Sequence, residues 1–329
     1  MAYRFQLDES FRDGFVRIGL EQIERAQQRL KSLEDRAVAI HDTRKGLKRI
    51  RALLRLARPG LGDKVFRREN ARFREIAGML AGVRDRQVLA ETLAKLEQRS
   101  SPKATAAIGE FRALLAEKEG TPAHRDDGAV KKALAALEEA HRSFGKLKLS
   151  AGFAAIAPGL EDCYRRGCKA FAAAYDEPSD EAFHEWRKTV QQHWRHMALL
   201  SRAWPDVMSG RVAEARKLSE LLGEDHDLAL LKALVAAKVQ AKDGIRRALA
   251  RDMDGLCRQR QRELRAAALL RGRRLFAQSP KDLRRQTALY WKAACRMAGE
   301  KAEQPEVSLG RSSAPRLPMR RTRKPAQRT

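Results

Sequence analysis

Apolar residues recur every three or four positions along most of the chain, and no stretch alternates apolar and polar residues as a half-buried strand does. This spacing predicts consecutive amphipathic helices separated by short breakers rich in Gly, Pro and Asp. The expected helices cover residues 9–32, 34–57, 63–81, 84–99, 103–118, 129–146, 153–175, 179–203, 207–222, 229–238, 243–278 and 281–299, with a linker at 120–128. The sequence therefore predicts an all-α protein.

Three short motifs occur twice, in the same order and at a nearly constant offset. They are Gly19-Leu20-Glu21 with Gly159-Leu160-Glu161, His41-x-x-Arg44-Lys45 with His184-x-x-Arg187-Lys188, and the segments that end at Asp85 and Asp227, at offsets of 140, 143 and 142 residues. Such a repeat indicates a duplicated helical unit, too long for a solenoid. We expect two antiparallel helical bundles, at about 8–147 and 150–300, related by an internal pseudo-two-fold axis.

The helix expected after residue 34 has one apolar face and one cationic face. On a wheel of 3.6 residues per turn, five cations fall within about 80° of His41. They are Arg44, Lys45, Lys48, Arg51 and Arg55, and the opposite side carries Leu47, Ile50, Leu53, Leu54 and Ala57. Like charges three or four residues apart repel each other by a few tenths of a kcal/mol per pair. An anionic ligand would relieve that repulsion.

The second copy repeats this arrangement in a weaker form. The polar stripe led by His184 contains Arg187, Lys188, Gln191, Arg195 and Arg202, and the opposite face contains Trp186, Val190, His193, Met197 and Leu200. Gln191 stands where the first copy has Lys48, which lowers the charge of the stripe. We interpret His193, on the apolar face, and His196, at its border, as hydrogen-bonded structural histidines.

The charge of the whole chain strengthens the case for an anionic partner. Its 68 Lys and Arg residues exceed its 42 Asp and Glu residues, for a net charge of +26. A proline-containing segment, residues 302–329, carries +5 of this and is expected to be a disordered basic tail. The rest of the chain keeps +21, which favours a polyanion as partner.

The sequence gives little support for a membrane or secreted protein, for a metal site or for an enzyme. No apolar run is long enough to span a membrane, and no secretory signal is visible, so we expect a cytoplasmic protein with reduced cysteines. No coherent set of metal ligands or acid–base residues is visible, and we expect neither a metal nor a cofactor nor enzymatic activity. The pattern leaves the oligomeric state open.

Together, the repeated motifs resemble the CHAD family, the conserved histidine α-helical domain, over residues 3–300. The resemblance is carried by His41-x-x-Arg44-Lys45-x-x-Lys48-Arg49-x-Arg51, by His184-Glu-Trp-Arg187-Lys188, by the elements ending at Asp85 and Asp227, and by Tyr3-Arg-Phe. It implies two pseudosymmetric bundles with a basic central surface or pore that binds inorganic polyphosphate, often at polyphosphate granules. One departure is that Gln191 and Gln192 replace the Lys and Arg of the first copy, which predicts unequal halves.

We therefore predict a protein that binds inorganic polyphosphate without catalysis and associates with polyphosphate granules. The expected binding residues are His41, Arg44, Lys45, Lys48, Arg49, Arg51, Arg55, His184, Arg187, Lys188, Gln191, Arg195 and Arg202. Non-specific binding of nucleic acid is the alternative, although no helix–turn–helix, zinc finger or RNA-reading aromatic motif is visible. A metal phosphohydrolase built on His41-Asp42 and His226-Asp227 is the third hypothesis, but we interpret Asp227 as a cap at a helix N-terminus.

Overall fold

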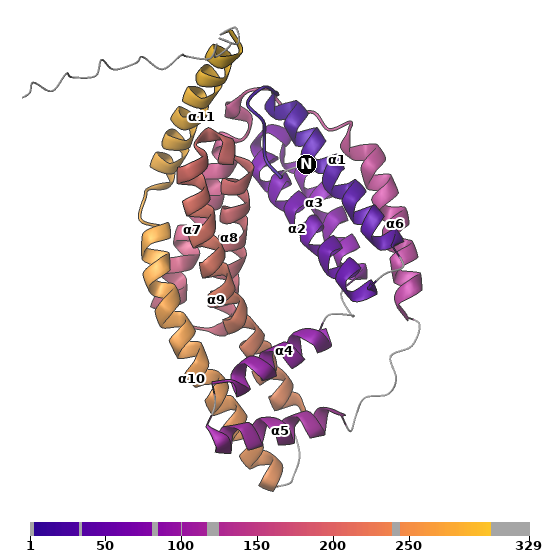
Figure 1. Cartoon of the computed structure of the whole chain (residues 1–329), viewed down its shortest axis with the longest axis vertical. Helices are drawn as coiled ribbons and strands as arrows, with labels where there is room; N and C mark the ends of the chain where they lie inside the picture. The colour runs from indigo at the N-terminus through magenta and orange to yellow at the C-terminus, as the bar shows by residue number, and fades with distance from the viewer. Residues whose placement is uncertain are drawn as a thin grey trace, which may run out of the picture.

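The computed structural model describes residues 3–32, 35–80, 85–99, 101–116, 125–238 and 244–303. Within these ranges the chain forms eleven α-helices, two short 3-10 turns and no strand, which confirms the all-α class (Figure 1). They are α1 (Phe11–Lys31), α2 (Arg36–Leu61), α3 (Asp63–Met79), α4 (Asp85–Glu97), α5 (Pro102–Ala116), α6 (Arg125–Phe144), η1 (Phe153–Ala155), α7 (Ala157–Asp176), α8 (Asp180–Leu199), η2 (Ser201–Ala203), α9 (Pro205–Lys238), α10 (Gly244–Leu275) and α11 (Pro280–Glu303).

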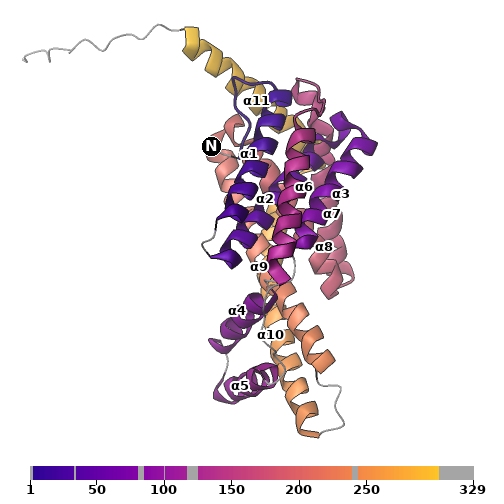
Figure 2. The same ribbon diagram turned by 90° about the vertical axis from the view of Figure 1, so that its right-hand side faces the viewer.

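The first bundle consists of α1, α2, α3 and α6 (Figures 1 and 2). The apolar face predicted for α2 is buried in its core, with Leu47, Ile50, Leu53, Leu54 and Ala57 all 0% exposed. Helix α1 approaches α6 closely at Gly19, because a Cβ there would lie 1.9 Å from the ring of Phe144. The aliphatic residues that recur with helical spacing in the sequence thus form the packing surface of this bundle.

The second bundle contains α7, α8, α9 and α10, with α11 against α7. Trp186 of α8 is 0% exposed and lies among the rings of Phe171, Tyr175 and Phe183. The apolar face predicted for α8 is buried, with Trp186 and Val190 in this core, Met197 and Leu200 in the core of the first bundle, and His193 at 2% exposure.

Helix α9 runs unbroken from Pro205 to Lys238, so the prediction of two helices at 207–222 and 229–238 was wrong. Leu222, Leu228 and Leu231 are each 1% exposed and continue the helical spacing across the expected break. Packing against neighbouring helices outweighs the low helix propensity of Gly223 and the acids that follow it. Asp227 therefore lies within a helix, and its interpretation as an N-cap was also wrong.

Helices α4 and α5 come from the first half of the chain but pack against α9 and α10 (Figures 1 and 2). Leu93, Ile108 and Phe111 form a separate apolar cluster with residues such as Leu231 and Met253. The predicted division at 8–147 and 150–300 thus follows chain order, whereas these two helices pack across it.

The remaining differences lie at helix ends. Helix α2 continues through Pro59 to Leu61, and Gly62 then turns the chain with φ of 79°, which favours glycine. Helix α6 begins at Arg125, inside the predicted linker 120–128. The predicted tail lies, from residue 304 on, outside the described residues.

The two bundles meet where α2 crosses α7 and α8. Gly159 of α7 touches the backbone of α2, since a Cβ there would lie 2.0 Å from the carbonyl oxygen of Leu56. One helical turn earlier on α2, the buried His196 ring lies 3.0 Å from the carbonyl oxygen of Ala52. These contacts bring the two histidine-led helices together. Their relation by a pseudo-two-fold axis stays a prediction.

Candidate functional site

The crossing of the bundles divides the cations of α2 into two rows. Ala52 and Leu56 lie in the middle of the predicted stripe, but they are 1% and 0% exposed because α8 and α7 cover them. What we call the first row is Arg44, Lys48, Arg51 and Arg55, toward α3 and α7. The second row is Lys45 and Arg49, toward α1.

Three arginines of the first row, Arg44, Arg51 and Arg55, each donate a hydrogen bond to a neutral acceptor. Arg44 donates to the carbonyl oxygen of Leu80 at 2.8 Å, and Arg51 donates to the amide oxygen of Asn70 at 3.1 Å. Arg55 donates to the carbonyl oxygen of Arg51 at 3.3 Å. Burial, followed by the charge of Arg51, lowers the pKa of Arg55 to about 10. Among the described residues, neither Arg51 nor Arg55 contacts a carboxylate.

The second row faces a basic groove of about 230 Å³ between α1 and α2. Arg25 and Arg29 of α1 line it together with Lys45 and Arg49, and Asp42 is the one acid in that lining. Both Arg29 and Lys45 pair with Asp42. Sequence reasoning missed the contribution of α1, although Arg25 and Arg29 are spaced one turn apart in the sequence.

Arg195 of α8 is the most deeply buried cation at the crossing, at 7% exposure. Its guanidinium donates to the carbonyl oxygen of Gln191 at 2.6 Å and lies 4.4 Å from the centre of the Trp194 ring. Arg216 of α9 lies over the same ring at 4.8 Å. Burial, together with neighbours such as Arg49, lowers the pKa of Arg195 to about 10. Arg195 contacts no carboxylate in the described part of the chain.

The other end of the α8 stripe contains a pair of stacked imidazoles. His184 lies 3.9 Å from His226 of α9, centre to centre, with 26° between the rings. Burial is the main cause that lowers the pKa of both rings, that of His226 to about 4, and the charges of Arg187 and Lys188 add to it. Both imidazoles are therefore neutral at neutral pH.

His226 is a further candidate binding residue. From the sequence, it was considered only as part of a metal site. The repeat offers the signal that was missed, because the first copy has Arg84 at the matching position, outside the described residues. A cation in one copy and an imidazole in the other both suit an anion.

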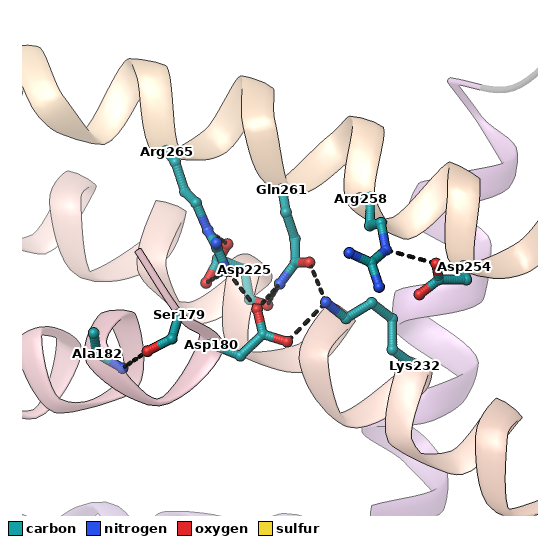
Figure 3. Close-up of polar contacts among 9 residues, drawn as sticks. All are labelled: Ser179, Asp180, Ala182, Asp225, Lys232, Asp254, Arg258, Gln261 and Arg265. Atoms are coloured by element: carbon teal, nitrogen blue, oxygen red, sulfur yellow. Dashed lines mark hydrogen bonds and ion pairs between the residues drawn. The ribbon is translucent and has the colours of Figure 1, made fainter. Parts of the chain in front are cut away.

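A polar network fixes the start of α8 against α9 and α10 (Figure 3). Asp180 pairs with Lys232 at 2.7 Å and with Arg265 at 2.6 Å, and Arg265 also pairs with the buried Asp225 at 2.7 Å. Gln261 donates to Asp180 at 3.1 Å. The network holds the first turn of α8 in register with α9, which sets His184 beside His226. It also pairs Asp180, whose charge acts on His226, with two cations.

The remaining predicted residues differ in their surroundings. Lys188 pairs with Glu185 on its own helix. Arg202 lies in η2, beyond the end of α8, and lines a pocket together with Trp204 and Tyr290.

The interpretation of His193 and His196 as structural histidines is confirmed. Both are buried, and Arg211 donates to His193 at 3.3 Å, while His196 contacts the backbone of α2.

No three His, Cys, Asp or Glu side chains in the described ranges come together as a possible metal site. None of the helices described has the length and apolar character needed to cross a membrane.

Fold and site thus define an all-α protein with cations gathered where two helical bundles cross. The profile of the CHAD domain matches residues 16–236, and the chain belongs to this family, which is associated with binding of polyphosphate and triphosphate. The crystal structure of the CHAD domain from the plant Ricinus communis is similar, with a TM-score of 0.51 and 17% identity over 84% of this chain and 95% of that chain. At that identity the likeness shows the fold alone. No curated protein matches the chain.

Proposed function

We propose that this protein binds inorganic polyphosphate through the cations of α2 and α8, without changing it chemically, and that this binding brings it to polyphosphate granules. The observation that carries the proposal is Arg195, a buried guanidinium with other arginines around it and no carboxylate within the described residues. A buried charge without a counter-charge is costly, so a polyanion at this crossing would be strongly favoured.

The distribution of ion pairs supports the same conclusion. Away from the crossing, arginines meet carboxylates, as in Arg17 with Glu9, Arg260 with Glu224, and Arg271 with Glu214. At the crossing, Arg49, Arg51, Arg55 and Arg195 show no such pair within the described ranges. Within the described residues these four cations therefore lack a counter-charge, which an anionic ligand would supply.

The chemistry of polyphosphate suits such a surface. Each interior unit carries about one negative charge and offers no base to read, so recognition depends on charge and spacing. Guanidinium groups grip two phosphate oxygens at once, and ammonium groups act as point charges. Residues one helical turn apart place these groups at about 5–6 Å intervals along α2.

The test removes lysines that are exposed or partly exposed. The triple variant K45Q/K48Q/K188Q should bind long-chain polyphosphate at least about tenfold more weakly, a loss of roughly 1.4 kcal/mol. The matched control K131Q/K132Q/K146Q removes three exposed lysines of α6 and its C-terminal end, and it should bind within about twofold of the parent. Calorimetric titration at fixed salt measures both. Equal affinities for the two variants would exclude this surface.

Competition separates polyphosphate from nucleic acid. Duplex DNA, added at the same phosphate concentration, should displace little bound polyphosphate, because a stiff duplex cannot follow cations distributed around a helix crossing. Complete displacement would favour the non-specific nucleic-acid function instead.

Granule association is tested in cells. A fluorescent fusion should form foci that disappear when polyphosphate synthesis is deleted. Foci that persist without the polymer would contradict the proposed localisation.

A further inference from the structure

A second basic cavity, of about 220 Å³, lies between the C-terminal end of α2 and the first half of α7. Its lining includes five cations, Arg55 and Arg58 of α2 and Arg165, Arg166 and Lys169 of α7, whereas Asp162 is the one acid in that lining. The polyphosphate site predicted from the sequence includes Arg55 but no residue of α7. We call this cavity the α2–α7 pocket.

The first row of α2 leads directly into the α2–α7 pocket. From Arg44 to Lys48, Arg51 and Arg55 the spacing is four, three and four residues, so each cation is the surface neighbour of the next. The next cation of α2 after Arg55 is Arg58, which also lines the pocket, and α7 closes on α2 at Leu56, where Gly159 touches the backbone. An extended anion that follows the row therefore reaches its end in the pocket.

Three of the five cations in the pocket meet no carboxylate among the described residues. Arg58 pairs with Asp63, and Arg165 pairs with Glu161 and Asp162. Arg55 bonds only to a backbone carbonyl, and Lys169 makes no ion pair in the described part of the chain.

Arg166 completes the set, because its main partner carries no charge. It donates to the Sγ of Cys163 at 3.1 Å and to the backbone oxygen of Asp162 at 3.4 Å. Burial raises the pKa of the Cys163 thiol, which therefore stays protonated and leaves the charge of Arg166 uncompensated.

We propose that the α2–α7 pocket binds the terminal phosphate of a polyphosphate chain whose interior follows the first row of α2. This proposal rests on the proposed function and adds recognition of the chain end to it. A terminal phosphate has a second ionisation near pH 6 and carries about −1.5 to −2 charges at pH 7, with three oxygens as acceptors. Three uncompensated cations in one pocket match that group better than they match an interior unit with one charge.

The size of the pocket agrees with a chain end. A volume of about 220 Å³ is room for only a few phosphate groups. A longer chain with its end in the pocket extends from there along the row.

The test compares two polyphosphates of one length, just long enough to span the first row. One has unmodified ends, and in the other both ends are capped with a small neutral amine, which leaves a single charge on each terminal phosphate. The parent should bind the unmodified chain about tenfold more tightly. The variant R166Q/K169Q should bind both chains with the affinity that the parent shows for the capped chain.

Two further variants separate the pocket from the row. K48Q, in the first row, should weaken binding of both chains while keeping the ratio between them, and K131Q on α6 should change neither. Equal affinities of the parent for capped and unmodified chains would overturn end recognition while leaving polyphosphate binding in place. A ratio unchanged in R166Q/K169Q would also overturn it. Failure of the parent to bind either chain would instead contradict the proposed function itself.

Discussion

Arg195 shows how one residue can restore a positive charge that its helix face lacks at another position. It lies 143 residues after Ala52, the same offset that separates the two leading histidines, so the repeat places it where the first copy has a small buried residue. Gln191, which replaces the first copy's Lys48, accepts a hydrogen bond from this arginine through its backbone. Arg195 thus supplies, one helical turn after Gln191, the positive charge that Gln191 does not carry. The sequence contains both residues, but it does not show that their helix, α8, packs against α2.

The first residue-scale prediction concerns Arg195 itself. Arg195→Met should leave the free energy of unfolding unchanged or raise it by about 1–2 kcal/mol, because it removes a buried charge that no carboxylate compensates. The same change should weaken polyphosphate binding about tenfold. Urea unfolding with and without polyphosphate measures both effects. Arg195→Lys keeps the charge and should retain most of the affinity, whereas a methionine variant destabilised by several kcal/mol would contradict this account.

The network of Figure 3 supplies a second residue-scale prediction. Asp225→Asn weakens the buried pair with Arg265 and should lower the free energy of unfolding by about 2 kcal/mol. The matched control is Asp254→Asn, at an exposed pair with Arg258, where little change is expected. Equal effects in denaturant unfolding would show that the network does not hold α8 and α9 in register.

At the scale of elements, α8 and α9 carry four histidines, His184 among them, whose pKa values lie below the ordinary value. Burial lowers that of His193 far, that of His196 to about 4, and that of His226 to about 4. Above about pH 7 these groups are neutral in both the folded and the unfolded chain. As the pH falls from 6.5 toward 4, the unfolded chain binds protons that the folded state does not accept.

Stability should therefore decrease on acidification over that interval, by a few kcal/mol in total. Urea unfolding at about pH 7 and about pH 5 measures the decrease. His226→Gln should reduce the pH dependence, and bound polyphosphate should oppose it, because a nearby anion favours the imidazolium form of His184 and His226. A stability that does not change over this interval would exclude burial of the neutral rings.

Individual elements also show what the sequence could predict. The faces of α2 and α8 followed from helical spacing, and the residues predicted to be apolar are buried. The helix that packs against each face could not be predicted. Helical spacing in a sequence does not say which helix covers Ala52 or which helix lies beside His184. The break predicted in α9 failed for the same reason, since burial of Leu222 and Leu228 decides the outcome there.

At the scale of the whole molecule, the net charge of +26 acts on stability and on binding in opposite directions. Mutual repulsion opposes the compact state, and salt screens it. Added sodium chloride should therefore raise the melting temperature of the protein alone while steeply reducing its affinity for polyphosphate. Thermal unfolding and titration over one salt series test both trends. A melting temperature that falls with salt would indicate that local ion pairs outweigh the net charge.

The packing of α4 and α5 has a consequence for synthesis of the chain. The first bundle is complete once α6 has emerged, but α5 ends at Ala116 and its partner α10 begins only at Gly244. At roughly 5–20 residues per second, the apolar sides of α4 and α5 wait several seconds on the ribosome before their partners exist. The apolar sides of α4 and α5 are thus covered only by helices that are synthesised much later, α9 and α10. A chain terminated before these helices would leave those sides exposed.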